Sequence, residues 1–370
     1  MRRFKFKVNG ESPRSLLLSY LLAKLNCDVY IYDFFINTNF NNDHQIFLFS
    51  NFTKNLLIKD GIWREIEDIS YGFTSFCIKD NLISEQFLLR TEKFSKNYFS
   101  TFGWTVNYSD MKNLFIDKLN KFDNVHFISK DQLIDEPLVF DYEFNFNSYN
   151  KFLKLPKFPI SLFKGINQHT LTFIVYLRGN IEKRLYEINT TEGLLVLTPI
   201  DKNLYQIVWN NPSSQIKRSL NSKSLFLDNL TALLSELNID QIIGDIDSQQ
   251  FTNYLPSYLI KNKSIYFNEN KLKSNTLYDF NFNILIRNII QIYNSFENNN
   301  SRNNNIANKI RFQYLLKKYI KFNTNIYYSN LFIILISLNN IFMLFLRKII
   351  FILLHRINIL RILLIKNLIN

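Results

Sequence analysis

The stretch VNGESPRS, Val8 to Ser15, joins a short apolar segment to a leucine-rich run. Phe4 to Val8 alternates as a strand does, Pro13 to Leu25 predicts a helix, and Asp28 to Tyr32 predicts a second strand. A glycine turn between a strand and a helix, with an acid such as Asp33 directly after the next strand, is typical of a dinucleotide-binding β-α-β unit. We therefore expect a Rossmann-like lobe to begin here.

Only one of the three glycines of the G-x-G-x-x-G fingerprint is present. The three places hold Gly10, Ser12 and Ser15. In the intact motif the first glycine makes the tight turn, the second lets the backbone reach a pyrophosphate, and the third packs the helix onto the sheet. The chain has 8 glycines, where an average composition would give roughly 26. Because each serine adds a Cβ where close approach is needed, we expect the architecture to persist with weakened phosphate contacts.

Further elements follow along the chain. We expect a strand end and a helix within Ile46 to Ile66, strands within Ser70 to Phe102, a helix over Ser109 to Phe122 and a strand over Val125 to Ile128. The middle of the chain predicts four strands of an antiparallel sheet: Thr170 to Tyr176, Arg184 to Asn189, Leu194 to Pro199 and Tyr205 to Trp209. Strands and helices alternate early and strands dominate the middle, which indicates an α/β fold with a Rossmann-like lobe interrupted by a β-sheet lobe.

These patterns give the expected domain boundaries. Residues 1–160 and 255–296 would form the discontinuous Rossmann-like lobe, with some strands around 70–102 belonging to the β lobe. Residues 161–254 would form the β-sheet lobe. A polar linker, Glu297 to Asn305, would lead to a basic, apolar helical segment over residues 306–370.

The net charge of +13 is concentrated near the end of the chain. No Asp or Glu follows Glu297, whereas 11 of the 44 Lys and Arg residues do. A nucleic-acid interface would combine basic side chains with stacking aromatic ones. This segment is basic and aliphatic instead, which favours an anionic membrane surface and excludes nucleic acid.

Leu331 to Leu346 supplies 16 largely apolar residues, fewer than the roughly 20 that a spanning helix needs. An interfacial or partner-facing helix and a buried helical cap both fit this stretch. The N-terminus lacks the apolar core of a signal peptide. Single cysteine and histidine residues without ligand spacing predict no metal site and a reducing compartment; they are Cys27, Cys77, His44, His126, His169 and His355.

The order of segments resembles the flavin-dependent ring hydroxylases of ubiquinone biosynthesis, the UbiH-type relatives of para-hydroxybenzoate hydroxylase. Four stretches carry the likeness: the fingerprint through Asp33, Ile46 to Ile66, Phe102 to Ile128, and EINTTEGLLVLTPIDKNLYQIVWNNP from Glu187 to Pro212. The last of these is the most specific. The resemblance implies a FAD-binding fold and, because the flavin carries the hard chemistry, no catalytic nucleophile or acid/base pair from the protein.

The resemblance also implies where FAD contacts would lie. Gly10 matches the first fingerprint glycine, Asp33 matches the acid that binds the adenosine ribose, and Glu269 stands where a second motif has aspartate. Asn283 and Arg287 match residues of a third segment. Departures from the family pattern are Ser12, Ser15, Gln45 in place of an arginine, Asn268 in place of a glycine, Phe280 at the middle of a Gly-Gln-Gly turn, and Asn288 in place of an acid.

Two functions therefore fit the sequence. The first is a FAD-dependent monooxygenase acting on a polyprenylated phenol or a similar apolar aromatic. The second is a non-catalytic relative that serves as a membrane-associated partner or lipid-binding subunit of a quinone-biosynthesis complex. Either would be cytoplasmic and peripheral at the inner membrane. One face of the middle sheet, along Thr170 to Tyr176 and Leu194 to Trp209, would line an apolar substrate pocket or simply form core.

Overall fold

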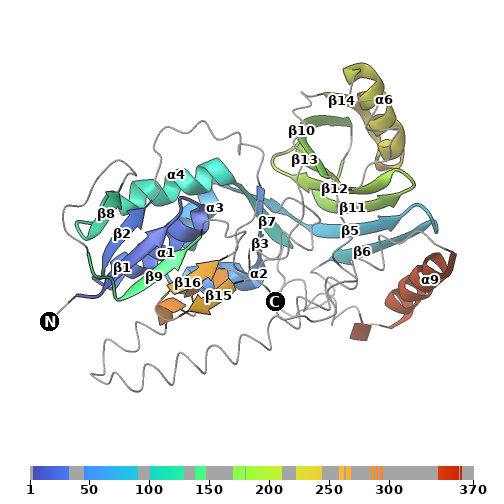
Figure 1. Cartoon of the computed structure of the whole chain (residues 1–370). Helices are drawn as coiled ribbons and strands as arrows, with labels where there is room; N and C mark the ends of the chain where they lie inside the picture. The colour runs from blue at the N-terminus through green and yellow to red at the C-terminus, as the bar shows by residue number, and fades with distance from the viewer. Residues whose placement is uncertain are drawn as a thin grey trace.

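A computed structural model of the chain contains three sheets with helices packed on them (Figure 1). The structure describes the following residues: 3–32, 46–90, 101–128, 138–146, 170–179, 181–210, 222–243, 258–261, 264–267, 283, 286, 287, 289, 290, 292–294, 341–357, 359 and 360. All structural statements concern these residues.

The first sheet has the strand order β15-β16-β9-β1-β2-β8. Its strands are β1 (Lys5–Asn9), β2 (Asp28–Tyr32), β8 (Val125–Ile128), β9 (Tyr142–Asn145), β15 (Tyr258–Lys261) and β16 (Ser264–Phe267). β1 pairs in parallel with β2 and β9, and β2 with β8. Phe6 and Val8 of β1 are fully buried while their neighbours are half-buried, as expected for a strand with one face on the core.

Helices α1 (Pro13–Lys24) and α4 (Tyr108–Leu119) pack on this sheet and on each other. α4 buries Met111, Phe115 and Leu119, which are spaced by four residues and therefore lie on one side of the helix. Tyr20 of α1 contacts Phe115, with ring centroids 6.2 Å apart. The β1-α1-β2 crossover expected from the sequence is confirmed, and the expected bounds of α1 and β2 hold within one residue.

The second sheet has the order β14-β10-β13-β12-β11-β5-β6. Its strands are β5 (Ser75–Asp80), β6 (Glu85–Arg90), β10 (Thr170–Gly179), β11 (Arg184–Thr190), β12 (Gly193–Pro199), β13 (Leu204–Asn210) and β14 (Ile239–Ile243). The four strands expected in the middle of the chain, β10 to β13, are present. Where two of them are neighbours in the sheet, they pair antiparallel. α6 (Lys223–Leu234), which the sequence analysis did not predict, covers one face of this sheet (Figure 1).

A three-stranded sheet connects the two larger ones. It consists of β3 (Ile46–Ser50), β7 (Gly103–Asn107) and β4 (Ser70–Phe73), in that order. The Thr105 hydroxyl of β7 donates to the Pro199 carbonyl of β12 at 2.7 Å, which joins this sheet to the seven-stranded one. The helices α2 (Asn51–Lys59) and α3 (Trp63–Asp68) follow β3, and Trp63 packs edge-on against Trp104.

The helix α9 (Ile341–Arg356) lies beside β6 (Figure 1). Only its first six residues belong to the stretch Leu331 to Leu346 that the sequence singled out, and the rest of that stretch lies outside the described residues. The helix instead runs through the basic pair Arg347 and Lys348. None of the helices in the described part of the chain is long and apolar enough to cross a membrane.

Candidate functional site

Gly10 forms the turn between β1 and α1. Its φ is +124°, a backbone conformation that glycine adopts readily and other residues rarely do. Its N–H donates to the Tyr32 carbonyl at 3.1 Å, so the turn sits between the ends of β1 and β2. The one fingerprint glycine that the chain contains is therefore the one that the backbone path requires.

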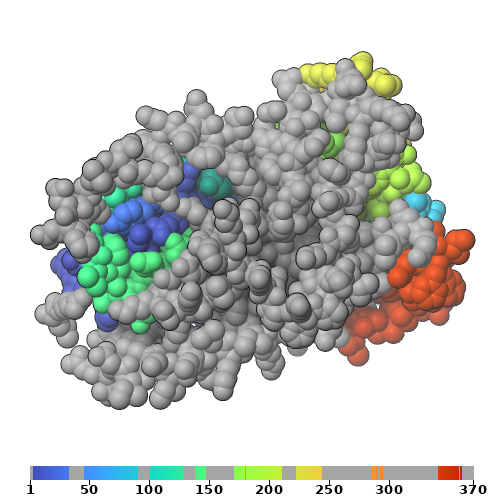
Figure 2. All heavy atoms as spheres, viewed as in Figure 1, coloured from blue at the N-terminus to red at the C-terminus, as the bar shows by residue number. Residues whose placement is uncertain are grey.

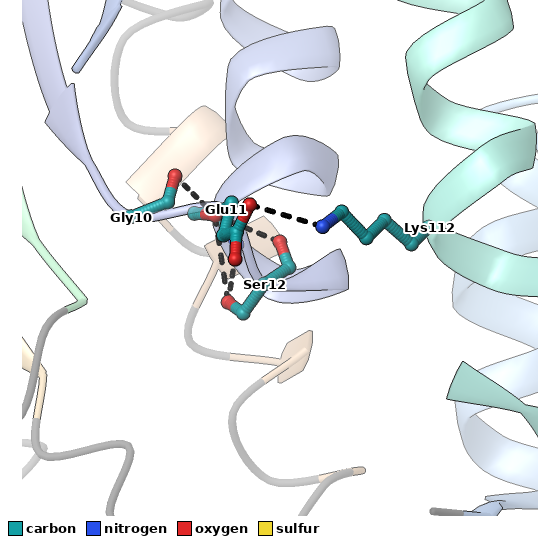
Figure 3. A network of polar contacts seen from close by, with 5 residues as sticks. Gly10, Glu11, Ser12 and Lys112 are labelled. Atoms are coloured by element: carbon teal, nitrogen blue, oxygen red, sulfur yellow. Dashed lines mark hydrogen bonds and ion pairs between the residues drawn. The ribbon is translucent and has the colours of Figure 1, made fainter. Parts of the chain in front are cut away.

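Ser12 caps the N-terminus of α1. It has extended backbone angles, φ −70° and ψ 153°, and its hydroxyl accepts a hydrogen bond from the Ser15 N–H at 3.2 Å (Figure 3). Pro13 occupies the first helical position, where its missing N–H costs nothing. The free N–H groups of a first helical turn form an anion site. Here one of them is already bound by the chain's own hydroxyl.

Ser15 is fully buried at the place of the third fingerprint glycine. Its hydroxyl lies 3.0 Å from the Gly10 carbonyl and 2.7 Å from the Ser12 carbonyl, so the turn satisfies it. Because a buried hydroxyl with a partner carries little penalty, the helix still packs on the sheet with a serine at this place. The side chain at this place is thus bonded within the turn, and the architecture persists as expected.

Glu11 introduces a negative charge beside the same helix end. Its Oε2 lies 3.0 Å from Lys112 Nζ of α4, and both side chains are 16% exposed (Figure 3). A carboxylate near a helix N-terminus is stabilised by the helix dipole, as a phosphate is. The sequence analysis did not identify either residue as part of the site. Nothing local signals the pair, because it depends on how α4 packs against α1.

Asn283 connects a distant part of the chain to the end of β3. It is buried, its Nδ2 donates to the Leu48 carbonyl at 2.8 Å, and its Oδ1 accepts from the Ser50 N–H at 2.9 Å. Ser50 in turn caps α2 by accepting from the Thr53 N–H at 3.3 Å. Asn283 therefore has an anchoring role, and its contact with a cofactor stays a prediction.

Arg287 places a partly desolvated positive charge close to α2. Its guanidinium carbon lies 4.2 Å from the centre of the Phe52 ring, a cation–π contact. Burial lowers the pKa of Arg287 to about 10, so it remains charged at neutral pH. Its buried Nε has no hydrogen-bond partner in the structure. A guanidinium N–H in this state is able to donate to an anionic or carbonyl oxygen of a ligand.

The middle sheet has two unlike faces. Its apolar face packs beneath α6, where Phe226 meets Phe173 edge-on at a centroid distance of 5.4 Å. Of the two interpretations of this face, substrate pocket or core, the structure therefore confirms core. The opposite face is also buried but largely polar; its polar side chains include Thr172, Glu187, Asn189, Thr198, Gln206 and Asn210. The Oγ1 atoms of Thr172 and Thr198 are buried and have no hydrogen-bond partner in the part of the chain that the structure describes.

Three of the sequence-predicted site residues lie outside the described residues. They are Asp33, Gln45 and Glu269. Gly10, Ser12 and Ser15 lie together at the β1–α1 turn, whereas Asn283 lies at the β3–α2 junction. The roles assigned to all seven from the resemblance stay predictions.

No family model matches the sequence, and no curated protein matches it either. Solved structures do resemble it. The p-nitrophenol 4-monooxygenase PnpA from Pseudomonas putida DLL-E4 matches with a TM-score of 0.68 and 11% identity over 100% of both chains. PqsL from Pseudomonas aeruginosa, in complex with 2-aminobenzoylacetate, matches with a TM-score of 0.58 and 9% identity over 80% of this chain and 86% of the other.

The chain has the fold of FAD-dependent monooxygenases. A further neighbour is a mutant of 2-methyl-3-hydroxypyridine-5-carboxylic acid oxygenase, with a TM-score of 0.55 and 11% identity over 80% of this chain and 84% of the other. The expected α/β fold, with a Rossmann-like lobe, an antiparallel β lobe and a C-terminal helix, is confirmed. Identities this low show the fold alone.

The β1–α1 turn fits the pyrophosphate of FAD in its backbone path and less well in its side chains. Gly10 has the required conformation, and α1 begins directly behind it. The Ser15 N–H, however, is released to a phosphate only when the Ser12 cap opens. An N-cap contributes about 1 kcal/mol, which corresponds to roughly a fivefold loss of affinity. The Glu11 carboxylate adds repulsion, which Lys112 offsets.

Proposed function

We propose that this chain is a FAD-dependent monooxygenase that hydroxylates a polyprenylated phenol, and that it binds FAD more weakly than an intact fingerprint does. The observation that carries the proposal is the β1–α1 turn: Gly10 at φ +124° stands between two parallel strands and the N-terminus of α1. A turn of this kind places a helix N-terminus against a pyrophosphate. The resemblance to ubiquinone-biosynthesis hydroxylases supports the substrate class.

The residues that would hold FAD follow from the turn and from the resemblance. The backbone of Gly10 and Ser12 would face the pyrophosphate, with Lys112 neutralising charge once it is released from Glu11. Asp33 would bind the adenosine ribose, as the resemblance implies. When bound and reduced, FAD supplies the activation of oxygen for hydroxylation of an electron-rich ring. The protein's own contribution is to bind, to orient the ring and to exclude water.

The polar face of the middle sheet supports a site for the ring. Thr172 lies on β10 and Thr198 on β12, separated by β13, and both side chains are buried on the face opposite α6. A buried hydroxyl without a partner costs about 1 to 3 kcal/mol, so it is expected to bind a ligand's polar group. We assign one of these two hydroxyls to recognition of the phenol oxygen, because the intervening β13 places them too far apart to bind the same atom. The apolar face under α6 is filled by core side chains and is not the substrate face.

A second function is favoured by the side chains at the same turn. Ser12 binds the Ser15 N–H, and Glu11 with Lys112 supplies an anion beside the helix end, so the turn is complete without a ligand. A protein in this state would be a non-catalytic relative that retains the fold and serves as a partner or lipid-binding subunit. The two functions differ in one measurable quantity, the affinity for FAD.

The test is titration of the full-length protein with FAD, with flavin fluorescence as the readout. The wild type is compared with the variant Ser12→Gly. Glycine at an N-cap costs only a few tenths of a kcal/mol of stability, so the variant folds. Removing the cap hydroxyl should tighten FAD binding about fivefold. The matched control is Ser222→Gly at the N-cap of α6, which should leave the affinity unchanged.

Each outcome assigns the function. Weak binding by the wild type that tightens in Ser12→Gly supports the proposal. A wild-type protein that is purified with stoichiometric flavin contradicts the reduced affinity and leaves the enzyme function standing. If neither protein binds FAD at saturating concentration, the monooxygenase function is wrong and the non-catalytic relative replaces it.

A further inference from the structure

One side of α9 is fixed to the β lobe. Arg347 and Asp80 are each 2% exposed, and Arg347 Nη1 lies 3.0 Å from Asp80 Oδ2. Phe351 and Leu354 belong to a core cluster with residues of β5 and β6. These three helix residues follow the four- and three-residue spacing of a single helical side. The helix is therefore held in one orientation rather than free to rotate.

The end of the helix carries a second attachment. The His355 ring Nε2 lies 3.1 Å from the Gln86 carbonyl of β6, and the ring packs edge-on against Phe87 with centroids 5.5 Å apart. Because α9 is attached near its middle and at its C-terminal end, the direction in which its remaining side chains point is fixed as well. In Figure 2 the helix forms an uncovered ridge at the edge of the molecule.

The side of α9 that faces away from the β lobe is apolar. Ile341 is 87% exposed, Phe342 65% and Phe345 63%, and Ile352 and Leu353 are more than one third exposed. We call these five residues the outer face of α9. Single exposed apolar residues are ordinary on a protein surface, but a contiguous group that includes two aromatic rings marks an interaction site.

The charges that α9 itself carries are all of one sign. α9 contains no acidic residue, and Lys348 and Arg356 are exposed beside the apolar side chains. Beyond the helix, the whole chain after Glu297 has no Asp or Glu. A protein partner would have to supply a large apolar patch bordered by acids, whereas an anionic lipid surface presents both features together.

The buried ion pair decides how α9 would meet a bilayer. Arg347 is committed to Asp80 and is unable to enter the hydrocarbon region without breaking that pair. The helix would thus lie in the plane of the interface with one side immersed.

We propose that the outer face of α9 binds the surface of an anionic membrane. Phe342 and Phe345 enter the acyl-chain boundary, Lys348 and Arg356 contact lipid phosphates, and the opposite side stays docked on β5 and β6. This surface is independent of whether the β1–α1 turn binds FAD. On α9, the docked side corresponds to the buried cap that the sequence left open, and the proposed membrane contact of the other side corresponds to the interfacial helix.

The test is co-sedimentation of the full-length protein with vesicles of phosphatidylcholine containing phosphatidylglycerol, and with vesicles of phosphatidylcholine alone. The variant Phe342→Ser/Phe345→Ser should lower the partition coefficient on the anionic vesicles at least tenfold, because two exposed aromatic side chains lose their transfer free energy. High salt should weaken wild-type binding. Leu225→Ser, at an exposed leucine of α6, is the matched control and should bind as the wild type does.

The variant should fold normally, because Phe342 and Phe345 are exposed; its thermal melt should match that of the wild type. Quenching by brominated lipid of a tryptophan introduced on the outer face, Phe345→Trp, is a second measurement of immersion, because the chain's own tryptophans are buried away from α9. Equal partitioning of wild type and double variant contradicts the proposal. So does a wild type that binds no vesicle but dimerises with increasing concentration, with the same two substitutions abolishing the dimer, since a second copy of the chain would then occupy the outer face.

Discussion

Replacing Arg347 by methionine tests whether the buried ion pair holds α9 on the β lobe. Arg347 and Asp80 are each 2% exposed and lie 3.0 Å apart. Removing one partner of a buried pair costs about 3 to 5 kcal/mol, mainly because the remaining charge stays desolvated. Asp80 would still accept from the Leu82 N–H at 3.1 Å and from Asn189 Nδ2 at 3.3 Å. We therefore expect the lower end of that range, about 3 kcal/mol.

The loss should appear as local opening of the helix rather than as global unfolding. Besides the ion pair, α9 contributes the buried Phe351 and Leu354 and the partly buried Ile350 to its core cluster, and His355 contacts β6, so few contacts hold it and it is able to detach while the sheet stays folded. A loss of about 3 kcal/mol corresponds to roughly a hundredfold fall in protection against amide hydrogen exchange. Exchange measured by mass spectrometry on peptides of α9, compared with peptides of β12, gives this value directly.

Two further variants distinguish the loss of the Arg347–Asp80 ion pair from a general disturbance of α9. Arg347→Met/Asp80→Asn removes both charges, so its exchange should return to within about tenfold of the wild type. Lys348→Met changes the neighbouring exposed base and should leave α9 protected. Two outcomes would show that an uncompensated buried charge is not the cause. One is an unchanged exchange of α9 in Arg347→Met, and the other is a double variant that opens as readily as the single one.

Two other predictions concern the β lobe and the thiols. Thr198→Val removes a buried hydroxyl that has no hydrogen-bond partner among the described residues. The free energy of unfolding without ligand should therefore rise by about 1 kcal/mol. A fall in the urea midpoint would show instead that the hydroxyl has a partner. Burial raises the pKa of Cys27 from 9.0 to about 11, so the unfolded thiol ionises first. Stability should therefore decline as pH rises through that interval, with a shallower decline in Cys27→Ala; identical slopes would refute the assignment.

The first lobe was predictable because its signals are local. The alternation in β1, the leucine run of α1 and the apolar content of β2 each fix an element within a few residues. α6 was missed although Phe226, Leu230 and Leu234 repeat every four residues, which is the spacing of one buried helix side. That signal was present in the sequence and could have been used.

Strand partners were not predictable from such patterns. The expected run of strands over Ser70 to Phe102 is divided between two sheets: β4 pairs with β7, while β5 pairs in parallel with β11. Side-chain alternation fixes which face of a strand is buried, but it does not fix the neighbour across the ladder. The pairs Glu11–Lys112 and Arg347–Asp80 were invisible for the same reason, since each joins elements far apart in the sequence.

The structure shows how the turn folds with serines at two fingerprint places. We expected each serine to place a Cβ where cofactor or strand approaches closely while the architecture is kept. Ser12 instead has φ −70°, which any residue adopts, and Ser15 lies inside α1 with its hydroxyl bonded to the turn. Neither position needs glycine for the chain to fold.

That distinction separates folding from ligand binding at the turn. Gly10 is required by its own φ of +124°, so replacing it would strain the backbone whether or not a ligand is present. Glycine at the second place is needed only where a pyrophosphate approaches the backbone closely, and Ser12 places a hydroxyl over the helix end instead. The fingerprint residue that folding requires is therefore present, and the one that close ligand approach requires is replaced. This is the pattern expected of a turn whose affinity for FAD is reduced while its architecture is intact. Ser12→Gly should therefore change the affinity for FAD while lowering the stability by only a few tenths of a kcal/mol.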